Sequence, residues 1–452
     1  MRRLAILIVL FGGMQLVLPL GTQGQGSQAL LSFGFLILGA YTVGEIAAGV
    51  GLPKIVGYLL SGVLFGPHVL GAVTEAGATR LAPISELAVA IIAFLAGAEL
   101  RWAEVRDRGT VLGKIMTVEL VLSFVAIAGF VYLTRGWIPP AADLPAIEAL
   151  AFAMLFAAVA IVHSPAVTMA LLTETGAKGP VARTTLGVVL LADVAVVLLF
   201  SGVLTFARVL APPAGPVAGP SLLLVLWEIG GALIIGSAMG AAVAAYLRFV
   251  GKDLVLFGVL AAFFGLEVAQ LAHVELLLTM LMAGFVAENF SEHGEKLRHA
   301  MERSAAPIFV VFFALSGAKI ELAQVGPLLP LVVPIAIVRG LAIWSGVKIG
   351  ARWARTKDDE SRYVWMGLVS QAGVAIGLAA ILAEAYPERG PHLAGMLLAL
   401  IAVNESVGPI LFRRALDKSG ETGESSSTGT ASPASASAGK AVPDGEPRQA
   451  PS

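Results

Sequence analysis

The chain has 452 residues, of which 57% are hydrophobic and 13% are charged, and its formal net charge is −1. Soluble domains average roughly 45–50% apolar and about 25% charged residues, so this composition excludes an ordinary soluble protein and indicates one that crosses a membrane many times. The sequence contains no cysteine, which excludes disulfides, thiolate metal sites and thiol redox chemistry.

Apolar runs near 20 residues long, separated by polar or Gly/Pro segments, predict the membrane spans. These runs are 3–21, 29–49, 53–72, 82–100, 110–134, 147–174, 182–208, 221–247, 251–268, 274–289, 303–322, 325–350, 362–385 and 391–412. Residues 1–28, which begin Met-Arg-Arg before an apolar run, have the pattern of a signal peptide or of an additional helix. We therefore expect an all-α polytopic membrane protein with 13–14 transmembrane helices.

The basic residues predict the orientation. When alternate loops are assigned to opposite sides, most of the 30 Lys and Arg residues fall on the same side, which the positive-inside rule places in the cytoplasm together with the C-terminus. The tail, 415–452, is rich in Ser, Gly, Ala and Pro and is expected to be disordered. No strand–GxGxxG–helix unit follows the spans, so no nucleotide-binding regulatory domain is expected in this chain.

A single carboxylate, Asp193, lies well inside the apolar stretch 182–208. It is roughly 15 Å from the start of that stretch if the stretch is helical. An ionised carboxylate in the middle of a membrane costs several kcal/mol, so such acids face a water-filled cavity, a partner or a transported ion. We expect Asp193 to bind a proton or a monovalent cation; a permanent pair with a basic residue is the structural alternative.

The tripeptide His163-Ser164-Pro165 interrupts an otherwise apolar run. Pro165 removes a backbone donor and breaks the helix, so freed carbonyls and the Ser164 oxygen could face a monovalent cation together with Asp193. A proline kink satisfied by Ser164 is the alternative. His163 could titrate near neutral pH as a sensor or relay, although a lone membrane histidine is more often a hydrogen-bonded structural residue.

Several segments resemble, in order, the cation/proton antiporter superfamily, with features of sodium/proton exchangers and of the potassium-efflux branch. Residues 52–67 are similar to its LPxxxGYLxxGxxxGP signature, and Phe94–Leu100 to its FLAGLEL segment; the Asp193 helix, Arg339-Gly340 and Gln371-Ala372-Gly373 follow. The resemblance covers roughly 30–414. It implies a transmembrane antiporter domain at 29–414, built from inverted repeats whose core helices are about 110–208 and 325–412, with two crossing interrupted helices.

Other polar residues lie at the places where this fold would need them. Gln371 and Gly373 would form the second break, where Gln371 offers either an oxygen to a cation or an interhelical hydrogen bond. Arg339 cannot plausibly deprotonate, so it either pairs with an acid or offsets charge at the broken helices. Glu119 and Glu405 are its candidate partners, and a structural Arg–Glu pair is the favoured interpretation. Glu45, Glu228 and Glu267 lie nearer span ends, where a solvated acid is expected.

The function expected from these residues is secondary antiport of Na⁺ or K⁺ against H⁺, serving pH homeostasis, and not enzyme catalysis. Family members commonly carry an acid or amide before the ion-binding acid, where this chain has Ala192. One carboxylate then holds either a proton or a cation, which favours electroneutral one-for-one exchange. The alternatives are a potassium-efflux system that needs a separate regulatory subunit, and a non-transporting membrane sensor that retains the fold.

The expected partners follow from the same function. We expect membrane lipids, monovalent cations and protons, with no cofactor and no nucleic acid, in a cytoplasmic (inner) membrane. A homodimer is also expected. Gly236 and Gly240 form a GxxxG pattern that suits either contact between two copies or packing within one chain.

Overall fold

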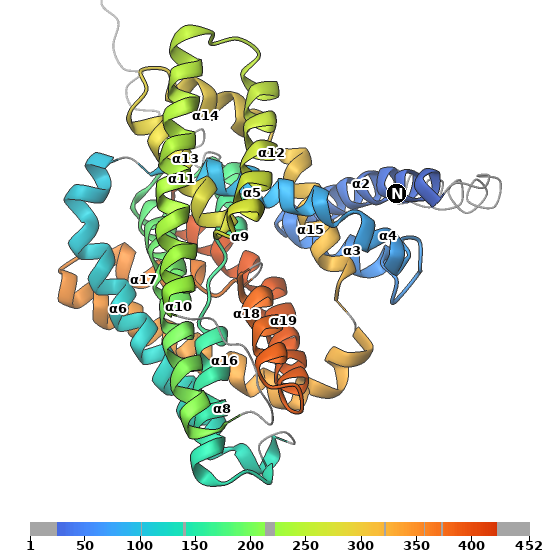
Figure 1. Cartoon of the computed structure of the whole chain (residues 1–452), viewed down its shortest axis with the longest axis vertical. Helices are drawn as coiled ribbons and strands as arrows, with labels where there is room; N and C mark the ends of the chain where they lie inside the picture. The colour runs from blue at the N-terminus through green and yellow to red at the C-terminus, as the bar shows by residue number, and fades with distance from the viewer. Residues whose placement is uncertain are drawn as a thin grey trace, which may run out of the picture.

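The computed structural model describes residues 25–100, 102–138, 142–212, 222–320, 322–356, 358–371 and 374–422, and over these residues all regular structure is helical (Figure 1). The helices are α2 (Gln25–Gly49), α3 (Lys54–Phe65), α4 (Glu75–Arg80), α5 (Ala82–Glu99), α6 (Trp102–Leu133), η1 (Arg135–Trp137), α8 (Ala146–Ala160), α9 (Pro165–Thr175), α10 (Pro180–Leu210), α11 (Leu222–Phe249), α12 (Leu254–Ala272), α13 (Leu276–Asn289), α14 (Gly294–Arg303), α15 (Ala306–Ala318), α16 (Leu322–Ala354), α17 (Asp358–Gly367), α18 (Val374–Ala385) and α19 (Gly390–Lys418). The segment expected at 3–21 lies outside the described residues.

Nine helical segments in the described part of the chain are long and apolar enough to cross a membrane, and ten are if the bent pair α14–α15 counts as one span. Three shorter apolar helices, α3, α13 and α18, fall within the expected spans 53–72, 274–289 and 362–385. Every expected span from 29–49 onward therefore contains an apolar helix. The all-helical polytopic fold is confirmed, and the shorter helices arise where a Gly, Pro or polar residue ends the run early.

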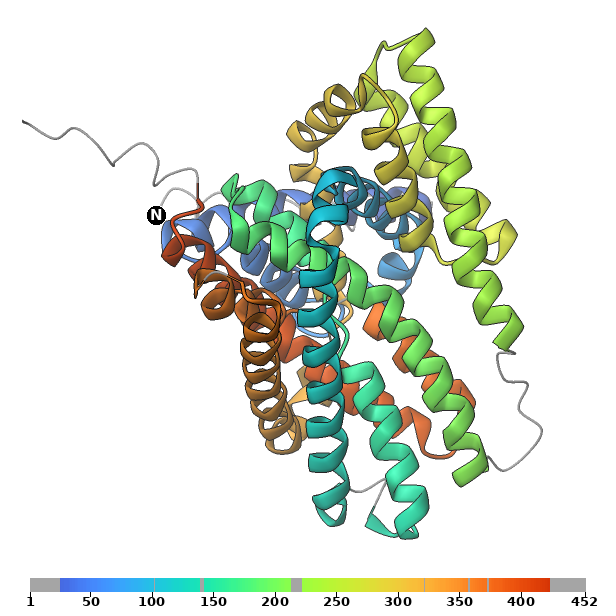
Figure 2. The same cartoon turned by 90° about the vertical axis from the view of Figure 1, so that its left-hand side faces the viewer.

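Two triplets of helices form the core around the functional residues. The first contains α6, the interrupted helix α8–α9 and α10; the second contains α16, the interrupted helix α17–α18 and α19. α6 and α16 pack along each other, as the teal and brown helices of Figure 2 show. Gly346 and Gly350 permit this, because a side chain there would collide with the α6 backbone at Glu119 and Ile115.

Both expected interruptions are present. α8 ends at Ala160 and α9 begins at Pro165, which occupies the first helical position where its missing N–H is harmless. α17 ends at Gly367 and α18 begins at Val374. Gly373, expected within the second break, lies outside the described residues.

The remaining helices cross one another at glycines. A Cβ on Gly97 of α5 would meet the Leu281 carbonyl of α13, and one on Gly284 of α13 would meet the Phe94 carbonyl of α5. Gly62 of α3 and Gly317 of α15 make a second reciprocal contact of this kind. The segments 52–67 and 94–100, which carried the family resemblance, are therefore packing sites between helices.

Gly236 and Gly240 of α11 pack within the chain. A Cβ at either position would meet backbone atoms of Thr279 or Ala283 on α13. This face is covered by α13, so it is not available for contact between two copies.

The last helix, α19, runs to Lys418, and described chain continues to Thr422. The Glu421 carboxylate accepts hydrogen bonds of 2.8 Å from both Val181 N and Ala182 N. Glu421 thus satisfies two backbone donors in the first turn of α10, the helix that carries Asp193.

Candidate cation site and the broken helices

The two helix breaks meet at Arg339. Its side chain, on α16, is fully buried and donates to Ala160 O at 2.7 Å, Val162 O at 2.9 Å and Val369 O at 2.6 Å. These carbonyls lie at the C-terminal ends of α8 and α17, where a helix carries partial negative charge and unpaired acceptors. One guanidinium therefore compensates both broken ends.

This geometry corrects the favoured expectation for Arg339. Among the described residues it forms no ion pair with Glu119 or Glu405; its short hydrogen bonds go to backbone carbonyls, and its remaining side-chain contact is with His163 Nδ1 at 3.5 Å. The physical reason is the number of orphan carbonyls that two interrupted helices expose, which a planar guanidinium satisfies with several donors at once. Arg339 thus occupies the other place considered for it, against the ends of the broken helices.

Glu119 pairs instead with His163. His163 Nε2 lies 3.1 Å from Glu119 Oε2, and its Nδ1 lies 2.7 Å from Leu368 O. Ser123 Oγ donates to Glu119 Oε1 at 2.7 Å. Because both ring nitrogens of His163 are occupied, it links α6, the first break and the second break as a hydrogen-bonded structural residue.

Gln371 and Ser164 also have protein partners. Gln371 Nε2 donates to Ala160 O at 2.8 Å, and its Oε1 accepts from Asn404 Nδ2 at 2.7 Å. Ser164 Oγ accepts from Val167 N at 3.2 Å and so caps α9. Both side chains are buried, and both hold the broken helices in place through these bonds.

Asp193 differs from all of these residues. Its side chain, on α10, is only 7% exposed, and neither carboxylate oxygen has a hydrogen-bond partner in the described part of the chain. It faces a small cavity lined by Leu190, Asp193, Val194, Val197, Ile229, Glu275, Leu277, Leu278, Leu281 and Val374. The lining comes from α10, α11, α13 and the start of α18, so the expected grouping of Asp193 with Ser164 and His163 is not formed around this cavity.

A second buried carboxylate, Glu405 of α19, also lacks a partner at one oxygen, Oε1, within the described residues. It lines a separate cavity with Ser316, Lys319, Ile320, Val325, Ile376, Gly395, Leu398, Ile401 and Ala402. Val374 lines the Asp193 cavity and Ile376 lines this one, so the first turn of α18 lies between the two carboxylates.

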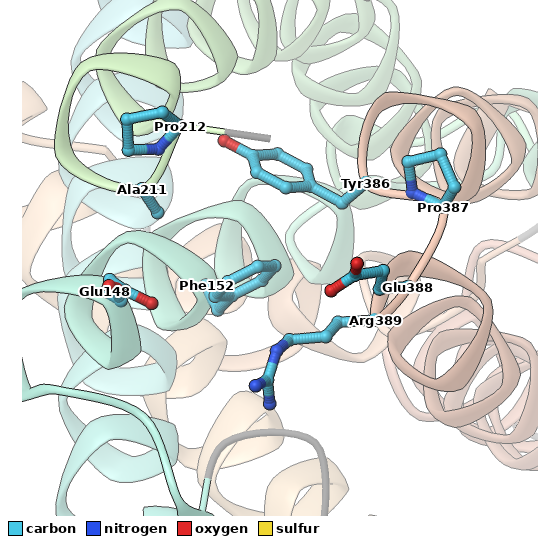
Figure 3. Close-up of a pocket in the computed structure, with 8 residues that line it drawn as sticks. All are labelled: Glu148, Phe152, Ala211, Pro212, Tyr386, Pro387, Glu388 and Arg389. Carbon is cyan, nitrogen blue, oxygen red and sulfur yellow. The ribbon is translucent and has the colours of Figure 1, made fainter. Parts of the chain in front are cut away.

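Another pocket lies at the far ends of the core helices (Figure 3). It is lined by Glu148, Phe152, Ala211, Pro212, Tyr386, Pro387, Glu388 and Arg389. The rings of Phe152 and Tyr386 meet edge to face with centroids 5.0 Å apart, and burial raises the pKa of the Tyr386 hydroxyl above its ordinary value. Neither Asp193 nor a break residue lines this pocket, so it is not the candidate ion site.

The described residues contain no group of three or more His, Asp or Glu side chains arranged to hold a metal ion. What the core offers is a buried carboxylate without a partner, set beside two interrupted helices. The sequence profile of the family described as "Sodium/hydrogen exchanger, transmembrane" matches residues 31–416. The chain belongs to this family.

Individual relatives agree with this assignment. This exchanger-family chain is 24% identical over 354 residues to a probable Na⁺/H⁺ antiporter, GerT, of Bacillus cereus, covering 76% of this chain and 88% of that protein. Its fold is similar to a structure at pH 8 of the sodium proton antiporter MjNhaP1 of Methanocaldococcus jannaschii, with a TM-score of 0.63, 15% identity and coverage of 87% of this chain and 96% of the other. An electron-microscopy map of the same antiporter gives a TM-score of 0.66, 16% identity and coverage of 86% and 97%.

Sequence reasoning missed one polar residue of the Asp193 cavity. Glu275 immediately precedes α13, and its carboxylate accepts from Leu277 N at 3.1 Å and from Leu278 N. An acid directly before an apolar run is a recognisable helix N-cap signal. That signal predicts the cap, but it does not predict which helix the capped end will face, so the cavity that Glu275 shares with the exchanger's buried Asp193 could be found only in the structure.

Proposed function

We propose that this exchanger-family chain is a secondary antiporter that exchanges a monovalent cation, Na⁺ or K⁺, for H⁺ at Asp193. The observation that carries the proposal is the pair of Asp193 oxygens, which are buried, without a partner in the described chain, and directed into a cavity. A buried carboxylate in this state must be neutralised, and the species that reach it through a cavity are a proton and a cation. Either species excludes the other.

The same observation argues against a sensor that only retains the fold. A non-transporting protein would be expected to hold Asp193 in a fixed salt bridge, because a basic partner permanently offsets the cost of burying the negative charge. The buried arginines among the described residues are engaged elsewhere: Arg339 donates to backbone carbonyls at the breaks, and Arg298 pairs with Glu99 and Glu302. Asp193 is left to bind an exchangeable ion.

Replacement of the carboxylate tests the proposal. In proteoliposomes with an imposed pH gradient, we expect Asp193→Asn to abolish cation-dependent dequenching of a pH dye. The amide has no negative charge, so it neither takes up H⁺ nor neutralises a bound cation. Glu267→Gln is the matched control, since Glu267 is an exposed acid on the neighbouring apolar helix α12. Undiminished exchange by a folded Asp193→Asn protein would overturn the proposal.

We further propose that the exchange is one-for-one and electroneutral, because a single exchangeable carboxylate carries either one proton or one cation. Imposing an inside-negative potential with a K⁺ ionophore should leave the rate of Na⁺/H⁺ exchange unchanged. A rate that follows the potential would contradict this stoichiometry without touching the assignment of Asp193. Comparing Li⁺, Na⁺ and K⁺ in the same assay separates sodium exchange from potassium efflux.

A further inference from the structure

Carboxylates lead from the surface of the molecule to Asp193. Glu228 is exposed near the start of α11, and Glu275, at the start of α13, is half-buried. The two segments are joined directly, because Glu275 N donates to Glu228 O at 3.3 Å, and Trp227 Nε1 donates to Ala272 O at 2.9 Å. Glu275 then lines the cavity into which Asp193 points.

The conformation of Glu275 is set by the helix that it caps. Its two oxygens accept from the backbone amides of Leu277 and Leu278. Hydrogen bonds donated to a carboxylate, together with the positive end of a helix dipole, favour its ionised form. Asp193, by contrast, receives no hydrogen bond from the described residues and is 7% exposed. The two carboxylates of this cavity therefore differ: Glu275 has hydrogen-bond donors in the protein, and Asp193 has none among the described residues.

The rest of the cavity wall provides no other charged group. Apart from Asp193 and Glu275, its lining side chains are Leu, Val and Ile. A monovalent cation at Asp193 takes oxygen ligands, and the side-chain oxygens available to it in this cavity belong to these two carboxylates. Glu275 also interacts electrostatically with Asp193, so a negative charge on it lowers the free energy of a cation placed beside Asp193.

We propose that Glu275 is a second carboxylate of the cation site, which sets its affinity for the cation, and that Glu228 attracts cations to its entrance. This inference rests on the proposed exchange at Asp193. In this role Glu275 supplies oxygen ligands and exchanges no proton itself, so the site has the same total charge with a proton on Asp193 as with a monovalent cation bound to it. The second carboxylate thus strengthens cation binding without changing a one-for-one exchange.

Cation titrations in proteoliposomes test the inference. For Glu275→Gln we expect the Na⁺ concentration at half-maximal exchange to rise by about tenfold, the equivalent of roughly 1.4 kcal/mol, a larger change than that in the rate at saturating Na⁺. For Glu228→Gln we expect a smaller rise that vanishes when choline chloride raises the ionic strength, because an exposed charge is screened.

Two further variants separate charge from helix capping. Ser is a good N-cap without charge, so Glu275→Ser should reproduce the affinity loss with α13 intact, whereas Glu275→Asp keeps both cap and charge and should bind Na⁺ as the parent does. Unchanged half-saturation in Glu275→Gln or Glu275→Ser overturns the inference. So does failure of both to fold while Glu275→Asp folds, since that assigns Glu275 a structural role only.

The two levels of the proposal fail in different ways. If Asp193→Asn still exchanges, the function at Asp193 is wrong and the role of Glu275 falls with it. If Asp193→Asn is inactive while the Glu275 variants titrate normally, only the second carboxylate is wrong.

Discussion

Arg339 shows what a single residue contributes when a helix is interrupted. An Arg–Glu pair would have neutralised one charge, but the carbonyls at the two breaks offer several acceptors that no other side chain in the described core satisfies together. Its contacts with Ala160, Val162 and Val369 all fall at helix ends. The residue is therefore a structural bridge between the two triplets, held by charge-assisted hydrogen bonds.

We expect Arg339→Lys to destabilise the protein although it conserves the charge. A lysine ammonium is a compact point charge and cannot reach carbonyls on both broken helices with the fork geometry of guanidinium. Loss of even one or two hydrogen bonds to a charged group costs about 2–4 kcal/mol. The unfolding temperature of the detergent-solubilised protein measures the loss, and Arg352→Lys, an exposed position on the same helix, should leave it unchanged. Equal stability of both variants would refute the bridging role.

The sequence located these polar residues because each interrupts an apolar run, and this is why Asp193, Arg339 and Gln371 could be singled out. Their partners were harder to predict. Glu119, one of two candidate partners of Arg339, hydrogen-bonds His163 in the structure. A carboxylate's position along a helix does not indicate which neighbour it turns toward. Glu275 lies at the end of a span, where an acid ordinarily faces water. No pattern in the amino-acid sequence shows that this end lines the cavity of Asp193.

At the scale of the helices, glycine decides how closely the spans approach. Gly284 lies where α13 crosses α5, and a Cβ there would collide with the Phe94 backbone, which cannot move as a side chain can. A Cβ added to Gly113 on α6 would meet no other atom within 4 Å in the described structure. These two residues form a matched pair for a test of helix crossing.

We expect Gly284→Ala to lower the unfolding temperature and the yield of folded protein, because a methyl group forces the two helices apart and overpacking of this kind costs about 1–3 kcal/mol. Gly113→Ala should be neutral or slightly stabilising, since alanine favours a helix more than glycine does. Fluorescence-detected size-exclusion chromatography after heating compares the two variants. A loss of the same size in both would mean that the crossing is not glycine-dependent.

Two backbone amides in the first turn of α10 donate to Glu421, about 240 residues further along the chain. Glu421→Ala removes the acceptor for Val181 N and Ala182 N, and loss of such a cap costs about 0.5–2 kcal/mol. We expect a modest fall in unfolding temperature, reproduced by truncation after Lys418 and absent after truncation behind Thr422. Identical stability of the two truncated proteins would show that Glu421 does not support α10.

The breaks themselves were predictable at this scale, since Pro165 and the polar residues near Gln371 disrupt runs that are otherwise continuous. The lengths of the helices were less so. α3 is shorter than the predicted run 53–72 because a Gly-Pro step ends it at Phe65, whereas α13 nearly fills the predicted run 274–289.

For the whole molecule, the distribution of basic residues predicts that the chain ends in the cytoplasm. The sequence contains no cysteine, so one introduced thiol reports on one place. We expect Lys418→Cys, at the exposed end of α19, to react with a membrane-impermeant maleimide only after the cells are permeabilised, which gives the reagent access to the cytoplasmic side. Gly136→Cys, exposed in η1, should react from the outside of intact cells. The reverse pattern would invert the orientation.

The order and class of the spans could be predicted for the part of the chain that the structure describes, because apolar length and helix breaks are local properties of a sequence. Which spans touch could not. The pairing of α6 with α16, or of α5 with α13, joins segments far apart in the chain, and the resemblance to a family supplied that arrangement only as two inverted repeats.

The lack of a partner for Asp193 bears on how tightly the two ion movements of the proposed exchange are coupled. A carrier that could return across the membrane empty would let one ion run down its gradient with nothing moved in exchange. If the ionised, unoccupied carboxylate lies several kcal/mol above its occupied states, as expected of a buried charge without a counter-ion, that futile return is suppressed by a factor of ten for each 1.4 kcal/mol, roughly. Under the proposed exchange at Asp193, the absence of a salt bridge at this position in the described chain is the feature expected to keep the two ion movements coupled.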